Sequence, residues 1–271
     1  MRILFLGDVV GRAGRDAVAE RLPGLTERHR FDFVVVNGEN ASHGRGLTEP
    51  HFRELKAAGA DVVTLGDHAF DQRDTLTYIE REPTLLRPLN LAPGAPGRGA
   101  NLIEARNGQR VLVINAQGRV FMEPIDDPFR AVEAAVAAAP LAEQADAIIV
   151  DFHTEETSEI QAMGFFLDGK VSLVVGTHTH IPTSDHSILK GGTALMADAG
   201  MCGDFDSVIG VEVDEPLNRF LTGIAQNRFT PAEGEATLCG VAIETDDETG
   251  LVKHVSPLRV GGTLAQAHPE F

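Results

Sequence analysis

Short runs of apolar residues, rich in Val, Ile and Leu, recur along the chain. Each run is apolar at nearly every position, which is typical of a strand that is covered on both faces. A strand with one face in water would instead alternate apolar and polar residues. The sequence therefore predicts a set of buried strands. They are Arg2–Leu6, Phe33–Val36, Asp61–Leu65, Val111–Ile114, Ala147–Val150, Val171–Val175 and Thr193–Met196.

Helical patterns separate several of these runs. Ala13–Arg30 has apolar residues at roughly helical spacing, and we expect Pro23 to kink or break that helix. Glu49–Ala58 follows Thr48, a residue type that caps helix N-termini. The Ala-rich segment Pro128–Ala139 predicts a third helix. Strands that alternate with helices in this way predict an α/β layered fold.

The rest of the chain shows no internal repeat and no long linker. We therefore expect one domain that spans residues 1–271. The Pro/Gly cluster at Ala92–Gly99 predicts a surface loop. After about Asn218 the pattern predicts short strands and turns, such as Thr237–Glu244 and Leu251–Val255. We interpret this last part as the second half of the sheet.

Polar residues with metal-binding atoms stand at the carboxyl ends of five predicted strands. In open α/β sheets that edge is where ligands bind. Carboxylates, amides and imidazoles together form a mixed oxygen and nitrogen ligand set that suits Mn, Fe or Zn. The five strand ends run into Gly7-Asp8, Asn37-Gly38-Glu39-Asn40, Gly66-Asp67-His68, Asp151-Phe152-His153 and Gly176-Thr177-His178-Thr179-His180.

Taken singly, each of these residues is typical of a turn or of a buried structural side chain, so the prediction rests on their combination. The strongest element is the pair His178 and His180, because residues two apart on an extended segment point to the same side. One ion rarely takes more than three or four protein ligands, whereas two ions sharing a bridging carboxylate need about seven. The sequence therefore predicts a dinuclear centre held by Asp8, Glu39, Asn40, Asp67, His153, His178 and His180.

The charge of the chain restricts its partners. Its 271 residues include 43% hydrophobic and 23% charged residues, which excludes disorder, collagen and coiled coil, and the formal net charge is −17. A surface this acidic repels the phosphates of nucleic acids, and the sequence has no Lys/Arg cluster to offset that repulsion. We therefore expect no long nucleic acid partner. Two divalent ions would outweigh the ligand carboxylates and attract one small phosphodiester.

Two cysteines and no long apolar run suggest an intracellular protein. Cys202 and Cys239 lie far apart, so we expect free thiols rather than a disulfide framework, with a single bridge as the alternative. No apolar run reaches the ~18 residues that span a bilayer. Arg2–Leu6 begins a strand rather than a signal peptide. We therefore expect a cytoplasmic protein with no membrane partner, and a homo-oligomer, since these are common.

The order of these motifs resembles the calcineurin-like metallophosphoesterase superfamily and, more narrowly, its bacterial YmdB-like branch. The matching segments are Gly7–Arg15, Asn37–Leu47, Asp206–Gly210 and Asn218–Gly223. The resemblance implies a metallophosphoesterase-type sandwich, with central β-sheets flanked by helices. It also implies a dinuclear-metal phosphodiesterase that hydrolyses small phosphodiesters, with 2′,3′- or 3′,5′-cyclic nucleotides as the expected substrates.

The resemblance further implies a role for each ligand. Asp8, Glu39, Asn40 and His180 would hold the first metal, and Glu39, Asp67, His153 and His178 the second, so that Glu39 bridges the two. His68 matches the proton donor of the family. Two positions depart from the superfamily pattern: Val10 replaces a usual His, and Asp67 replaces a usual Asn. The added negative charge favours a higher-valent ion, so we expect two ions of Fe or Mn, with Zn or Mg as alternatives.

A dinuclear centre removes the need for a side-chain nucleophile. Two ions roughly 3.5–4 Å apart turn a bridging water into hydroxide, and an imidazole, here His68, can protonate the leaving alkoxide. Arg12 and His43 are candidates for substrate binding, with solvated surface residues as the alternative interpretation. The alternative function is a metal-binding regulatory or scaffold protein with little turnover. Motif order disfavours an amidohydrolase, in which the His-x-His pair usually stands on the first strand.

Overall fold

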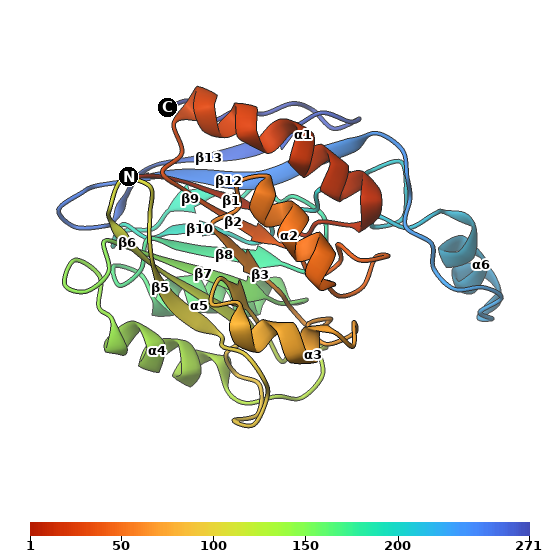
Figure 1. The fold of residues 1–271 in the computed structure, drawn as a ribbon, viewed down its shortest axis with the longest axis horizontal. Helices are drawn as coiled ribbons and strands as arrows, with labels where there is room; N and C mark the ends of the chain where they lie inside the picture. Colours follow the sequence, from red (N-terminus) through yellow and green to blue (C-terminus); the bar gives the residue numbers. More distant parts are fainter.

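The structure is a computed structural model that describes residues 1–271. Its strands and helices alternate through most of the chain (Figure 1). The strands are β1 (Arg2–Leu6), β2 (Phe33–Asn37), β3 (Val62–Thr64), β4 (Leu85–Leu86), β5 (Ala100–Glu104), β6 (Arg110–Gln117), β7 (Ala147–His153), β8 (Leu173–Thr177), β9 (Ser187–Ile188), β10 (Ala194–Met196), β11 (Gly203–Asp204), β12 (Ala236–Thr245) and β13 (Val252–Val260). The helices are α1 (Gly11–His29), α2 (Glu49–Ala57), α3 (Thr75–Tyr78), the 3₁₀ turn η1 (Ile79–Arg81), α4 (Pro128–Ala138), α5 (Thr157–Phe166) and α6 (Asp214–Thr222).

The strands form two separate sheets. The seven-stranded sheet has the order β11-β12-β1-β2-β3-β4, with β13 beside β12, and the six-stranded sheet has the order β5-β6-β7-β8-β10-β9. Strands β1 to β4 run parallel in the first sheet, as do β6, β7, β8 and β10 in the second. The carboxyl ends of parallel neighbours meet at one edge, so each sheet has an edge at which strand-end residues gather.

The two sheets pack face to face over an apolar interior. Phe5 and Phe33 from the first sheet meet Val113, Ile149 and Val175 from the second, and all five side chains are fully buried. Because the other faces of both sheets are also covered by helices, the strands have apolar residues at nearly every position.

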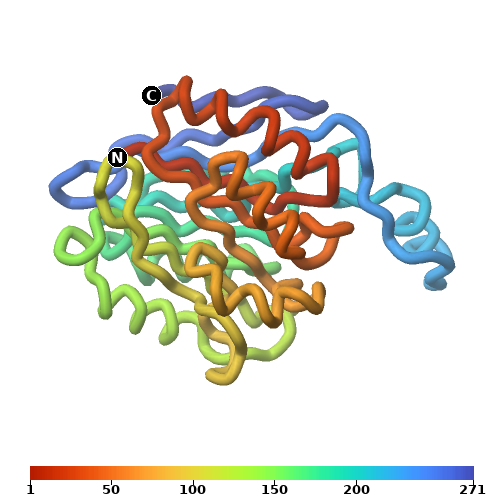
Figure 2. Tube along the Cα trace, in the orientation of Figure 1, coloured from red at the N-terminus to blue at the C-terminus, as the bar shows by residue number.

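Helices cover the outer faces of both sheets (Figures 1 and 2). Val18 and Leu22 of α1 and Leu55 of α2 belong to the apolar cluster on the seven-stranded sheet. Val132 of α4 and Ile160 of α5 belong to the cluster on the six-stranded sheet. The result is a four-layer arrangement of helices, sheet, sheet and helices, which confirms the predicted α/β sandwich.

Pro23 does not divide the first helix. Helix α1 runs without interruption from Gly11 to His29, although proline lacks the N–H that a helix interior needs. Val18 and Leu22 before Pro23 and Leu25 close after it are all buried against the sheet, so packing holds both halves in line. Neither α1, at 19 residues, nor any other helix is long and apolar enough to cross a membrane.

The carboxyl-terminal part differs from the predicted short strands. Helix α6 occupies Asp214–Thr222, and strands β12 and β13 are 10 and 9 residues long. Strand β12 pairs antiparallel with β1 in the seven-stranded sheet, which confirms that this part belongs to the same layer system. Strand β12 extends the predicted Thr237–Glu244 by one residue at each end, whereas β13 continues five residues beyond the predicted end at Val255.

Two smaller predictions are confirmed. Residues Ala92–Gly99 lie outside helices and strands, and most of them are exposed or half-exposed. Cys202 and Cys239 are buried free thiols. Burial raises the pKa of the Cys202 thiol to about 12, so this side chain acts as a small apolar residue.

The interior between the sheets gives a stability prediction. Replacing Phe5, which is fully buried there, with Ala should reduce the free energy of unfolding by about 3–5 kcal/mol, because a cavity replaces the ring. Urea unfolding followed by circular dichroism measures this change. The matched control is Phe121→Ala, since the Phe121 side chain is 84% exposed and should change stability by less than about 0.5 kcal/mol. Equal losses for the two variants would contradict the assigned core.

Candidate metal centre

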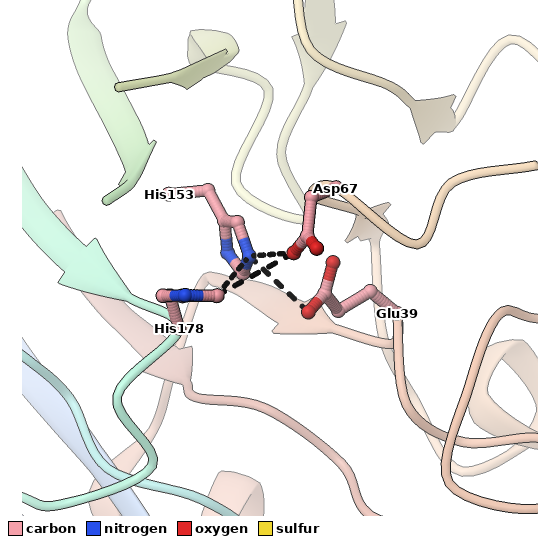
Figure 3. A group of neighbouring side chains, drawn as sticks. All are labelled: Glu39, Asp67, His153 and His178. Carbon is pink, nitrogen blue, oxygen red and sulfur yellow. Dashed lines mark hydrogen bonds and ion pairs between the residues drawn. The ribbon is translucent and has the colours of Figure 1, made fainter. Parts of the chain in front are cut away.

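Four predicted ligands from the ends of four strands converge in one cluster (Figure 3). One ligand atom from each of Glu39, Asp67, His153 and His178 lies within 4.8 Å of all the others. His153 Nε2 is 2.9 Å from Asp67 Oδ1 and 3.2 Å from Glu39 Oε1. His178 Nδ1 is 3.4 Å from the same Asp67 oxygen. Two carboxylates and two imidazoles at this spacing could hold a transition-metal ion.

The other three predicted ligands lie beside this cluster. Asp8 Oδ2 accepts a hydrogen bond from the backbone N–H of His178 at 3.3 Å, and His180 Nε2 is 3.9 Å from Asp8 Oδ1. The amide nitrogen of Asn40 donates to the carbonyl of Gly44. Asp8 Oδ1 and Asn40 Oδ1 are both buried without any hydrogen-bond partner. Since a buried oxygen without a partner costs free energy, these two atoms fit a bound cation.

The charges of the cluster also favour a cation. Burial raises the pKa of the Asp8 carboxyl to about 6, and the nearby His153 opposes this. Burial would raise the pKa of Glu39 as well, but the charge and hydrogen bond of His153 outweigh it and hold that pKa below its usual value. Conversely, burial would lower the pKa of His153, but Glu39 and Asp67 raise it well above the usual value. The carboxylates thus stabilise positive charge among them.

A buried chain of hydrogen bonds orients the imidazole of His153. Thr177 Oγ1 donates to Asp151 Oδ1 at 2.7 Å and lies 2.8 Å from His153 Nδ1. Because the hydroxyl proton goes to Asp151, the hydroxyl oxygen is free to accept from Nδ1–H. This directs Nε2 at Glu39 and Asp67, and a bound metal ion would take the place of the proton on Nε2.

The same network joins the two sheets. Asn37, the last residue of β2, donates through Nδ2 to Asp151 Oδ2 on β7 at 3.1 Å. Its side-chain oxygen accepts from the backbone N–H of Glu39 at 3.1 Å. Burial raises the pKa of Asp151 to about 7. One amide therefore fixes both the spacing of the sheets and the turn that presents Glu39.

The histidine pair reaches the site by a different backbone path from the predicted one. Strand β8 ends at Thr177, and His178 and His180 both have left-handed backbones, with φ of 108° and 67°. The expectation of an extended segment is therefore wrong. The left-handed turn directs the N–H of His178 to Asp8 and brings His180 Nδ1 to 2.7 Å from the carbonyl oxygen of Ile209. Such backbone conformations are uncommon outside glycine and cluster at functional sites.

Gly66 allows β3 to end against the cluster. A Cβ atom at this position would lie 2.2 Å from Glu39 Oε2 and 2.4 Å from His153 Nε2. Only a residue without a side chain can therefore stand immediately before the predicted ligand Asp67. The glycine is required by space, and its backbone lies outside the left-handed region.

His68 lies at the edge of the cluster. Its backbone N–H donates to Glu39 Oε2 at 3.3 Å, and its Nδ1 is 3.2 Å from Asp71 Oδ2. Asp67 Oδ2 is slightly farther from Nδ1, at 3.6 Å. The imidazole is thus held by two carboxylates. Its side chain is still 19% exposed, so a ligand can reach it.

Comparison with known proteins decides the family. The family model described as YmdB-like protein matches residues 4–258. The chain belongs to the YmdB-like protein family. This confirms the family that the motif order resembles.

Three similar proteins extend this result. The 2′,3′-cyclic-nucleotide 2′-phosphodiesterase of Bacillus subtilis is 46% identical over 249 residues, which cover 92% of this chain and 93% of that protein. The crystal structure of a novel phosphatase from Mycoplasma pneumoniae has a TM-score of 0.88 and 33% identity. The match covers 100% of this chain and 95% of that chain. The crystal structure of a hypothetical protein from Thermus thermophilus has a TM-score of 0.89 and 41% identity. The match covers 97% of this chain and 100% of that chain. These likenesses confirm the metallophosphoesterase-type fold and the prediction of a phosphodiesterase enzyme.

The two candidate substrate-binding residues of this YmdB-like protein lie apart from the cluster. Arg12 Nη2 donates to Glu233 Oε2 at 2.7 Å, and it lines a surface hollow with Asp16 and Glu20. Acidic neighbours make that hollow unsuitable for a phosphate. His43 is exposed, with a left-handed backbone, and its ring packs edge-on to His51. Neither side chain contacts a predicted metal ligand in the structure.

Several residues of the site went unassigned in the sequence. Asn37 and Asp151 stand in the strand-end segments, where the predicted ligands are Glu39 and Asn40 in the first and His153 in the second. Asp71 follows His68 by three residues, and a turn rather than a helix brings the two side chains together. The available signal was an acidic or amide residue inside an otherwise apolar strand, since such a residue requires a buried partner.

Gly66 gives a prediction about metal binding. Gly66→Ala should weaken the binding of Mn²⁺ by at least about tenfold, because the added Cβ displaces Glu39 or His153 from its ligand position. Isothermal titration calorimetry measures the affinity, and a thermal melt checks that the variant folds. The control is Gly94→Ala, where a Cβ meets no atom within 4 Å and binding should be unchanged. Unaltered Mn²⁺ affinity in folded Gly66→Ala would contradict the location of the site.

Proposed function

We propose that the protein is a metal-dependent phosphodiesterase that hydrolyses small cyclic phosphodiesters, with 2′,3′-cyclic nucleotides as the substrate class. The observation that carries this proposal is the cluster of Glu39, Asp67, His153 and His178 with two partnerless oxygens beside it. The substrate class is supported by 46% identity to a 2′,3′-cyclic-nucleotide 2′-phosphodiesterase over 92% of the chain. The 3′,5′-cyclic nucleotides are a weaker expectation, since no relative described above is named for them.

Seven side chains would hold two metal ions. One ion would lie among Glu39, Asp67, His153 and His178, and the other among Asp8, Asn40 and His180, with Glu39 shared between them. Iron or manganese suits this mixed oxygen and nitrogen set, and the carboxylate of Asp67 adds negative charge that favours iron. When bound, such a pair of ions supplies an activated water and neutralises charge on the phosphoryl oxygens.

His68 would donate a proton to the leaving alkoxide. Asp71 Oδ2 lies 3.2 Å from Nδ1 of the His68 ring. The other ring nitrogen, Nε2, has no hydrogen-bond partner within the chain. The Nε2–H is therefore the proton available to a substrate oxygen. The bond from the His68 backbone to Glu39 keeps the ring next to the ligand cluster. Geometry of this kind is what a general acid requires.

The acidic surface would select for small substrates. With a net charge of −17, the protein repels long polyanions, whereas a metal-loaded site attracts a single phosphodiester. We accordingly expect a small-molecule partner and no long nucleic acid.

A substrate panel tests the proposed function. The purified protein should contain about two equivalents of metal and hydrolyse 2′,3′-cAMP to a nucleoside monophosphate, with slower or no turnover of 3′,5′-cAMP. Elemental analysis and chromatography of the products measure the two quantities. If the protein binds two metal ions but hydrolyses none of the esters, bis-p-nitrophenyl phosphate included, it is a regulatory or scaffold protein and the proposal fails.

Replacement of His68 separates proton donation from metal binding. His68→Ala should keep its metal content and lose about 10²–10⁴-fold in kcat for 2′,3′-cAMP, because the leaving oxygen must depart without a proton. The loss should be much smaller for an ester with a p-nitrophenolate leaving group, which departs readily unprotonated. The control His254→Ala changes an exposed imidazole on β13 and should leave both rates unchanged. Equal losses for both esters would remove His68 as the proton donor.

A further inference from the structure

One segment of the chain stands away from the layered body. We call residues 213–229, which contain α6, the α6 arm; Figures 1 and 2 show it projecting beyond the sheets. The arm contributes no residue to any of the three apolar clusters. Helix α6 also makes no substantial contact with another helix or strand. The arm therefore lacks the packing that stabilises the other helices.

The arm nevertheless exposes large apolar side chains. Phe220 and Leu221 are 86% and 76% exposed, and Leu217 lies on the same face one turn earlier. Ile224 and Phe229, which follow the helix, are also exposed. Together these side chains form an apolar patch on the order of several hundred Å², of the size that marks an interaction site.

The arm is neutral in an acidic protein. Asp214 and Glu215 are balanced by Arg219 and Arg228, whereas the whole chain has a net charge of −17. Arg219 pairs with Glu215 at 2.7 Å and lies over the ring of Phe229, 4.0 Å from its centre. A second copy of this chain would be repelled by most of the surface, and the projecting arm is where two copies can meet while their acidic bodies stay apart.

The distribution of charge along the arm suits pairing with itself. The acidic residues stand in the first turn of α6, and the basic residues stand in its last turn and beyond. Two arms related by a two-fold axis perpendicular to α6 run antiparallel, which places the acidic end of each opposite the basic end of the other. The same rotation brings the two apolar faces together.

We propose that the α6 arm is an interface between two copies of this chain, which pair through Leu217, Phe220 and Leu221 about a two-fold axis. The proposal does not depend on the enzymatic function. It accounts for large apolar side chains in water on a helix without other packing, because the partner copy covers them.

Sedimentation of the full chain tests this interface. At about 50 µM the unaltered protein should sediment with twice the chain mass of 29.0 kDa. The double variant Phe220→Glu and Leu221→Glu should sediment as a monomer, with a dissociation constant raised on the order of 10²-fold or more, because four buried charges would face each other. Its thermal melt should show a folded protein, since neither residue belongs to a core.

A matched variant controls for the loss of any exposed phenylalanine. Phe165 on α5 is 67% exposed, so Phe165→Glu adds a similar charge elsewhere and should leave the mass at two copies. A monomeric unaltered protein at 50 µM would overturn the proposal. So would a double variant that keeps two copies, or a Phe165→Glu variant that loses them, because the contact would then lie outside the arm.

Discussion

The hydrogen bond from Asn37 to Asp151 is the contact on which the candidate metal centre depends. It crosses from β2 of one sheet to β7 of the other at 3.1 Å and closes the apolar interior at the edge where the strands end. Through Thr177, Asp151 then sets the orientation of the His153 imidazole. A buried amide and carboxylate are costly unless every atom is paired, so this pairing specifies one spacing of the sheets. The distance between the sheets in turn sets the distances between the predicted ligands.

The two-sheet arrangement explains why the ligands are distributed along the chain as they are. Glu39 and Asp67 follow strands of the first sheet, whereas His153 and His178 follow strands of the second, so this cluster of four exists only where the two sheets meet. The carboxylates come mainly from one sheet and the imidazoles from the other. Packing of the sheets therefore brings opposite charges together, and it raises the pKa of His153 while it lowers that of Glu39.

The sequence was sufficient to predict that polar side chains such as Glu39, Asp67 and His153 stand at or just after the carboxyl ends of strands, because an apolar run and the residues after it are local features. An apolar run followed by Gly and Asp, as at Gly7 and Asp8, can be recognised as a strand and its polar end without knowledge of the rest of the chain. The orientation of Thr177 could not be predicted, since it depends on distances between sheets. Nor could the left-handed backbone of His178, which is stabilised by a bond to Asp8 some 170 residues away. Likewise, Pro23 continues its helix because of tertiary packing, which local propensity does not include.

The least packed part of the molecule is connected to the most constrained one. The carbonyl of Ile209 accepts a hydrogen bond from His180, and the chain reaches the α6 arm only a few residues later. Backbone hydrogen bonds from Glu212 to Thr230 and from Ala232 to Gly210 join the two ends of the arm at this point. Beyond them the arm has no core contacts and opens more readily than the sheets. Pairing of two arms would restrict this opening, because each arm would then pack against the other.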